Sequence, residues 1–162
     1  MRRTGSAGGP KRVMNMESFK ILSTNHTSFT VSDLDWSLSF FRDIFGFEVT
    51  SNAPRDPQAI QHITGVEDAE VMIAYVRAPG HSVELIQYLR PDLRAKPQSR
   101  PCDVGFAHLA FDVDNVDAAV IAAEEYGVRP IAAPYVTEAG NKVVYLRDPD
   151  GITIELIQKL KE

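Results

Sequence analysis

The chain contains two copies of one sequence unit, and this repeat constrains its fold more than any other feature. The segment His26–Asp35 resembles His108–Asp117, which lies 82 residues further on, with matching histidine, phenylalanine, valine and aspartate residues. Val83–Gln87 resembles Ile154–Gln158 at an offset of 71 residues, and an extra segment around residues 56–65 absorbs the difference. Self-similarity of this kind indicates that each copy forms the same supersecondary unit.

Each copy has the pattern strand–helix–strand–strand–strand, because alternating apolar residues predict strands and an apolar spacing of three or four predicts a helix. In the first copy we expect a strand at Leu22–Val31, a helix from an Asp33 or Asp35 cap to Phe45, strands at Phe47–Ser51, Ala69–Arg77 and Ser82–Leu89, and a short inserted helix at Pro57–Ile63. In the second we expect strands at Phe106–Val113, Pro130–Val136, Lys142–Arg147 and Ile152–Leu160, and a helix at Val116–Tyr126.

These elements predict an α+β fold built from two paired β-α-β-β-β modules within one structural domain. The first module is expected at residues 20–90 and the second at residues 105–162, joined by a proline-containing linker at residues 91–104. Residues 1–19 contain several glycines and no sustained apolar run, so they predict a flexible tail rather than a secretory signal.

Composition excludes several classes of partner. The 162 residues include 17 basic and 22 acidic side chains, a formal charge of −5, which disfavours binding of nucleic acid through the overall field. No apolar run reaches the roughly 18 residues that a membrane span needs. The single cysteine, Cys102, excludes an intrachain disulfide and agrees with a reducing, cytoplasmic location.

Four residues at equivalent places in the two copies are candidate metal ligands. His26 and His108 open the first strand of each module, and Glu84 and Glu155 each lie between apolar residues of a later strand. An ionised glutamate inside a hydrophobic strand is costly unless it is paired or bound to a metal. The alternative is that each is an independent structural residue. The symmetric set favours a divalent ion, which imidazole and carboxylate ligands allow to be nickel, cobalt, manganese, iron or zinc.

The phrases Gly105–Val113 and Leu146–Leu156, together with the histidine that opens each half, resemble the vicinal oxygen chelate superfamily, which includes glyoxalase I, methylmalonyl-CoA epimerase, extradiol dioxygenases and bleomycin resistance proteins. The resemblance covers about Leu22–Leu160. It implies that the modules curl into a half-barrel sheet around one metal, that the ligand set falls on His26, Glu84, His108 and Glu155, and that the protein is a homodimer.

The resemblance also implies a chemistry. A metal-stabilised enediolate forms on a small-molecule substrate, and Glu84 and Glu155 serve as the catalytic groups that move a proton at the carbon next to a carbonyl. We therefore expect a metal-dependent epimerase or isomerase acting on a small polyhydroxylated ketone, such as a valiolone-type cyclitol, or a related acid. The alternatives are lactoylglutathione lyase and a resistance protein that sequesters a small molecule.

Two positions separate these possibilities. Thr30 and Tyr88 stand where glyoxalase I carries an arginine and an asparagine that contact glutathione, so the glutathione-dependent reaction is disfavoured. If strand faces are assigned correctly, four polar side chains line the pocket and bind a hydroxylated substrate: Ser28, Thr30, Tyr88 and Asp112.

Overall fold

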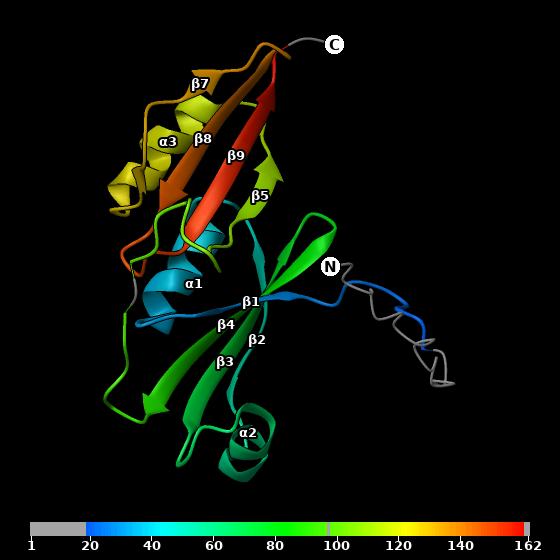
Figure 1. The fold of residues 1–162 in the computed structure, drawn as a ribbon, viewed down its shortest axis with the longest axis vertical. Coiled ribbons are helices and arrows are strands. Elements are labelled where there is room, and N and C mark those ends of the chain that lie inside the picture. The colour runs from blue at the N-terminus through cyan, green and yellow to red at the C-terminus, as the bar shows by residue number, and fades with distance from the viewer. Residues whose placement is uncertain (1–18, 97, 161–162) are drawn as a thin grey trace, which may run out of the picture.

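The computed structural model of the protein describes residues 19–96 and 98–160, so the tail expected at residues 1–19 lies, apart from Phe19, outside the described residues. Figure 1 shows the sheet of the first module at one end of the long axis and the sheet of the second module at the other. None of the helices in the described residues is long and apolar enough to cross a membrane.

The first module forms a four-stranded sheet with the order β1-β4-β3-β2. Its elements are β1 (Thr27–Thr30), α1 (Leu34–Asp43), β2 (Glu48–Pro54), α2 (Pro57–Thr64), β3 (Glu70–Ala78) and β4 (His81–Arg90). The edge strand β1 runs parallel to β4, and the other pairings are antiparallel. The short inserted helix predicted from the sequence is confirmed as α2, which begins at a proline and ends at a left-handed glycine.

The second module repeats this topology with the order β5-β9-β8-β6, and β7 also pairs with β8. Its elements are β5 (Leu109–Asp112), α3 (Val116–Glu125), β6 (Arg129–Pro130), β7 (Tyr135–Val136), β8 (Asn141–Arg147) and β9 (Thr153–Lys159). Again the first strand of the module is parallel to the last. The predicted α+β class and the paired modules are therefore confirmed.

Three predicted strands were too long. The strands expected at Leu22–Val31 and Phe106–Val113 are only four residues long, because β1 and β5 pair only along the middle of β4 and β9. The strand expected at Pro130–Val136 is split into β6 and β7. Pro130 and Pro134 both lack the N–H that a continuous ladder requires, which explains the break.

A glutamine in each module joins its helix to its sheet. The backbone N–H of Leu34, at the start of α1, donates to Gln87 Oε1 at 2.9 Å. In the same way the N–H of Val116, at the start of α3, donates to Gln158 Oε1 at 3.0 Å. The first N–H groups of a helix have no partner within the helix, so these two side chains satisfy them and fix each helix against the strand that carries the glutamate.

The two modules share one buried core. Val83 and Leu85 of β4 and Ile154 and Leu156 of β9 belong to the same apolar cluster. Aromatic rings join the modules directly, since the ring of Phe111 lies 5.3 Å from that of Phe47. Each sheet therefore buries one face in this core, and the side chains that alternate with the core residues lie on the opposite face.

Candidate active site

The first predicted pair of ligands comes together at the edge of the first sheet. Glu84 lies between Val83 and Leu85 in β4, so strand alternation points its carboxylate away from the core. Ser28 of β1 lies opposite Glu84 in the parallel ladder. His26 comes two residues before Ser28 and therefore lies on the same face. His26 Nε2 is 3.3 Å from Glu84 Oε2. The carboxylate is buried, with the whole residue 8% exposed.

The second pair has the same geometry. Ala110 of β5 lies opposite Glu155 of β9, and His108 precedes Ala110 by two residues. His108 Nε2 is 3.0 Å from Glu155 Oε2. The identical register in the two modules explains why the repeat brings together the same two residue types. We call His26 with Glu84 the first half-site, and His108 with Glu155 the second half-site.

Each half-site fits two ligands of one metal ion. Ligand atoms that bind a common ion at about 2.1 Å, and at about 90° to one another, lie about 3.0 Å apart. The observed spacings of 3.3 and 3.0 Å match this value. However, in residues 19–96 and 98–160 no three His, Cys, Asp or Glu side chains lie close enough together to hold one ion. The structure therefore brings the predicted ligands together as two pairs, not as a set of four.

A tyrosine accompanies each half-site, and neither was predicted as a site residue from the sequence. Tyr75 of β3 lies opposite Glu84 in the antiparallel ladder, and Tyr145 of β8 lies opposite Glu155. The Tyr75 hydroxyl donates a hydrogen bond to Glu84 Oε1. The two tyrosines are 70 residues apart and the two glutamates 71, so the repeat carried a signal that could have identified them.

The surroundings of each tyrosine raise its pKa. Burial raises the pKa of Tyr75 to about 12, and the hydrogen bond and charge of Glu84 act in the same direction. Burial and the charge of Glu155 also raise the pKa of Tyr145 above its usual value. Both phenols therefore keep their protons at neutral pH and are available as hydrogen-bond donors.

The orientation of His26 is fixed from its other ring nitrogen. Its Nδ1 lies 2.6 Å from Asn25 Oδ1. When Nδ1 donates to this amide oxygen, the other ring nitrogen, Nε2, which lies on the side of Glu84, is the one available to a cation. The ring of Tyr75 also lies edge-on to His26, at 5.6 Å and 86°. These contacts leave Nε2 as the atom that can bind a cation.

The predicted substrate residues divide between the modules. Ser28 and Thr30 are exposed on β1, on the same face as His26, and Tyr88 is half-buried on β4. Asp112 lies on β5 in the second module, where it is exposed, with Lys159 Nζ at 3.9 Å. A pocket lined by all four therefore requires the two half-sites to face each other.

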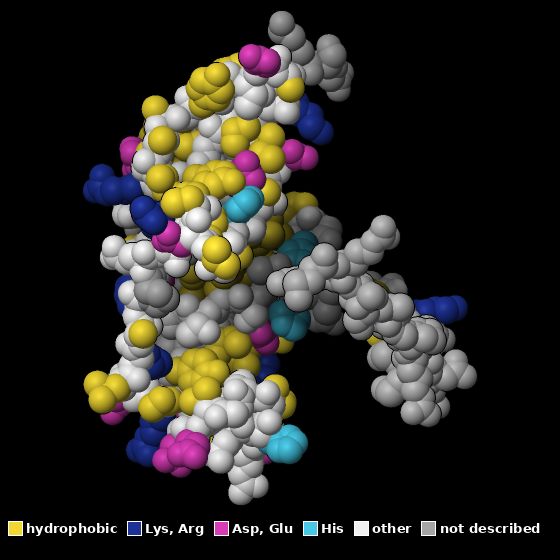
Figure 2. All heavy atoms as spheres, viewed as in Figure 1, with side chains coloured by type: hydrophobic (Ala, Val, Ile, Leu, Met, Phe, Trp, Pro, Cys, Tyr) yellow, Lys and Arg dark blue, Asp and Glu magenta, His cyan; other side chains and the backbone are white. Residues whose placement is uncertain are grey.

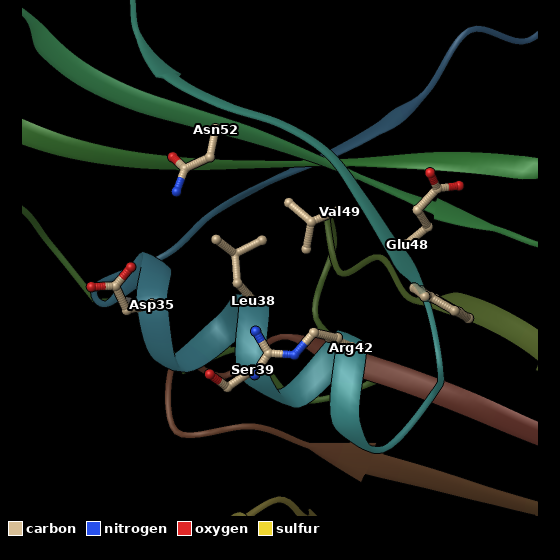
Figure 3. Close-up of a pocket in the computed structure, with 8 residues that line it drawn as sticks. Asp35, Leu38, Ser39, Arg42, Glu48, Val49 and Asn52 are labelled. Carbon is tan, nitrogen blue, oxygen red and sulfur yellow. The ribbon is translucent and has the colours of Figure 1, made fainter.

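The other two histidines, His62 and His81, do not join either half-site. His81 Nε2 is 2.9 Å from Thr27 Oγ1, and His62 lines a shallow cavity beside α2. A second cavity of about 700 Å³ lies between α1 and β2 (Figure 3), lined by Asp35, Leu38, Ser39, Arg42, Phe47, Glu48, Val49 and Asn52. It contains none of the predicted ligands or substrate residues.

Comparison with known proteins places these features in context. The model for the Glyoxalase/Bleomycin resistance protein/Dioxygenase superfamily matches residues 23–156. A 2-epi-5-epi-valiolone epimerase from Actinomyces sp is 33% identical over 149 residues, spanning 84% of this chain and 79% of the relative. The mitochondrial methylmalonyl-CoA epimerase of Mus musculus is 26% identical over 145 residues, spanning 86% of this chain and 75% of the relative.

Solved structures agree on the fold. A glyoxalase family protein from Bacillus cereus superposes with a TM-score of 0.81, covering 90% of this chain and 99% of that chain. The two sequences are 24% identical, so this likeness concerns the arrangement of helices and strands.

Proposed function

The chain belongs to the Glyoxalase/Bleomycin resistance protein/Dioxygenase superfamily, and from this premise we propose that it is a metal-dependent epimerase that moves a proton at a carbon next to a carbonyl group. The observation that carries the proposal is the pair of half-sites, each with an imidazole nitrogen and a carboxylate oxygen at the spacing of two metal ligands. The proposed substrate is a small polyhydroxylated ketone of the valiolone type. The 33% identity to an enzyme that bears the name 2-epi-5-epi-valiolone epimerase supports this choice.

The residues that would hold the ion are His26, Glu84, His108 and Glu155. Two neutral imidazoles and two carboxylates form a donor set suited to a first-row divalent cation and balance its charge. When bound, such an ion supplies Lewis acidity toward adjacent oxygen atoms of the substrate.

The chain's own groups carry out the proton transfer. One glutamate removes the proton from the carbon next to the carbonyl, and the other glutamate or a water returns it on the opposite face. Because Glu84 and Glu155 come from two different sheets, they can approach the carbon from different sides. The hydroxyl groups of Ser28, Thr30 and Tyr88 would orient the hydroxylated substrate beside the first half-site. Asp112 would bind the substrate beside the second.

A second copy of the chain would complete the site. One chain presents two half-sites that do not meet, and each needs two further ligands. In a two-fold symmetric dimer, the first half-site of one copy can face the second half-site of the other, which forms two identical four-ligand sites. Figure 2 shows hydrophobic side chains exposed on both modules. In the linker, Leu93 and Val104 are also fully exposed, as expected of surface that an assembly covers.

Two measurements test the proposal together. Protein dialysed without chelator should hold about one divalent ion per chain by elemental analysis, and a His26→Ala/His108→Ala double variant should lose it. His62→Ala, which changes a histidine of the first module outside the half-sites, serves as the matched control. With 2-epi-5-epi-valiolone in D₂O, the wild-type protein should introduce deuterium next to the carbonyl. Metal content unchanged in the double variant, or no deuterium exchange by metal-loaded protein, would refute the proposal.

A further inference from the structure

The two half-sites differ in how their glutamates are held. The Tyr75 hydroxyl donates to Glu84 Oε1. Tyr145 occupies the matching place beside Glu155, but within the described part of the chain its hydroxyl makes no hydrogen bond to that carboxylate; instead its ring lies 4.9 Å from the His108 ring at 37°. The same residue type therefore makes a polar contact in one module and a ring contact in the other.

The hydrogen bond from Tyr75 defines the role of each Glu84 oxygen. Oε1 is held by the phenol, and Oε2 lies on the side of His26, 3.3 Å from its Nε2. Rotation of the carboxylate would break the bond to Tyr75 and would leave a buried oxygen without a donor, which is costly. The carboxylate plane is therefore fixed with Oε2 beside the histidine nitrogen.

We propose that Tyr75 is a positioning residue that presets the first half-site for a cation by holding Glu84 through its Oε1 atom. The inference rests on the proposed metal-dependent function and extends it, because it assigns unequal roles to two half-sites that have the same ligands. Hydrogen bonds to metal-binding carboxylates and histidines fix their orientation, and loss of one typically weakens metal binding about 10- to 100-fold.

The chain provides its own matched control. Tyr75→Phe and Tyr145→Phe each remove one phenolic oxygen from the same place in the two modules, and each keeps the aromatic ring. The probe is Co²⁺ alone, and its dissociation constant is measured by competition with a chromophoric chelator. We expect Tyr75→Phe to weaken Co²⁺ binding about 10- to 100-fold. For Tyr145→Phe we expect a change of less than about threefold, because no hydrogen bond to the ligand is lost.

A second readout separates positioning from a purely structural role. Urea unfolding of the metal-free protein should show that both variants remain folded, with the lower midpoint in Tyr75→Phe because only this change leaves a buried Glu84 oxygen without its donor. Co²⁺ binding is measured in the absence of urea, where both variants are folded. Equal weakening of Co²⁺ binding in the two variants, or unchanged binding in Tyr75→Phe, would overturn the inference and leave the proposed function standing. Loss of the fold in Tyr75→Phe alone would overturn it too, since the hydroxyl would then be structural. Failure of the wild-type protein to bind Co²⁺ or any of the other candidate cations would overturn both.

Discussion

The first and second half-sites have the same backbone and different surroundings. In both, one residue of the neighbouring strand lies opposite the glutamate, and the histidine comes two residues before it. The distance from the histidine Nε2 to the glutamate Oε2 is 3.3 Å in the first half-site and 3.0 Å in the second. The first half-site is held by polar contacts, from Asn25 to His26 and from Tyr75 to Glu84. In the second, the rings of Phe106 and Tyr145 lie near His108, at 6.2 and 4.9 Å.

This difference shows what a repeat preserves. Strand register reproduces the distance between two ligands, because it depends only on the backbone ladder and on alternation. The contacts that orient those ligands depend on individual neighbours and have diverged. A held carboxylate suits a permanent ligand, whereas a carboxylate with fewer contacts can shift when it accepts a proton. On the proposed function, we infer from this difference that Glu84 serves mainly in metal binding and Glu155 mainly in proton transfer.

Substitution of each glutamate by glutamine tests this assignment with the largest expected effect. Glutamine keeps the volume and one oxygen but removes the basicity. Loss of a general base lowers kcat by about 10²- to 10⁴-fold, so Glu155→Gln should show this loss and should stop deuterium exchange into the substrate. Glu84→Gln should mainly weaken metal binding. Undiminished exchange in both variants, with metal still bound, would mean that the base lies elsewhere.

A smaller effect concerns the choice of substrate at the first half-site. Thr30 and Tyr88 lie there instead of residues that bind glutathione, so the hemithioacetal of methylglyoxal and glutathione should be a poor substrate. We expect kcat/KM at least about 100-fold below the 10⁶ M⁻¹s⁻¹ typical of a well-matched enzyme. Steady-state kinetics with the hemithioacetal and with 2-epi-5-epi-valiolone give the two kcat/KM values to be compared. A value near 10⁶ M⁻¹s⁻¹ for the hemithioacetal would favour a lactoylglutathione lyase.

A further effect, on stability and not on activity, concerns the hairpin that precedes Glu155. The turn between β8 and β9 contains Asp148, which accepts the N–H groups of Asp150 and Ile152 on Oδ1, each at 2.8 Å. Burial raises its pKa from 3.8 to about 6, in spite of the hydrogen bond from Ile152. The folded state thus binds this proton more tightly than the unfolded state. The contribution of Asp148 to the free energy of unfolding is fully present below about pH 4 and is lost as the pH rises to about 6.

Asp148→Asn isolates this effect, because asparagine keeps an oxygen for both N–H groups and does not ionise. Wild-type unfolding free energy should fall by up to about 3 kcal/mol between pH 4 and pH 6 through this group. In urea unfolding measured from pH 4 to pH 6, the unfolding free energy of Asp148→Asn should not show this decrease. Asp92→Asn, at an exposed site in the linker, is the control, and its unfolding free energy should decrease with pH as in the wild type. The same slope in Asp148→Asn as in wild type would contradict the prediction.

Much of this molecule could be predicted from the repeat. The modules, their helices and the placement of His26 and Glu84 on the strand face away from the core follow from matched segments and from alternation along strands. The short length of β1 did not follow, because it depends on where the chain diverges from β4, which extends beyond β1 at both ends. Tyr75 was missed although its signal is local: the two-residue turn at residues 79–80 sets the register of β3 on β4 and so places Tyr75 opposite Glu84. The separation of the half-sites depends on how the modules pack, which neither copy encodes alone.

Complementation between two inactive chains tests most directly whether two copies form one site. His26→Ala removes a ligand from the first half-site, and His108→Ala removes one from the second. Neither homodimer should bind Co²⁺ tightly. A heterodimer of the two variants, co-expressed and purified through two different affinity tags, should recover one tight site per dimer, because one of its composite sites contains both histidines. A heterodimer that binds Co²⁺ no better than either homodimer would contradict the composite site.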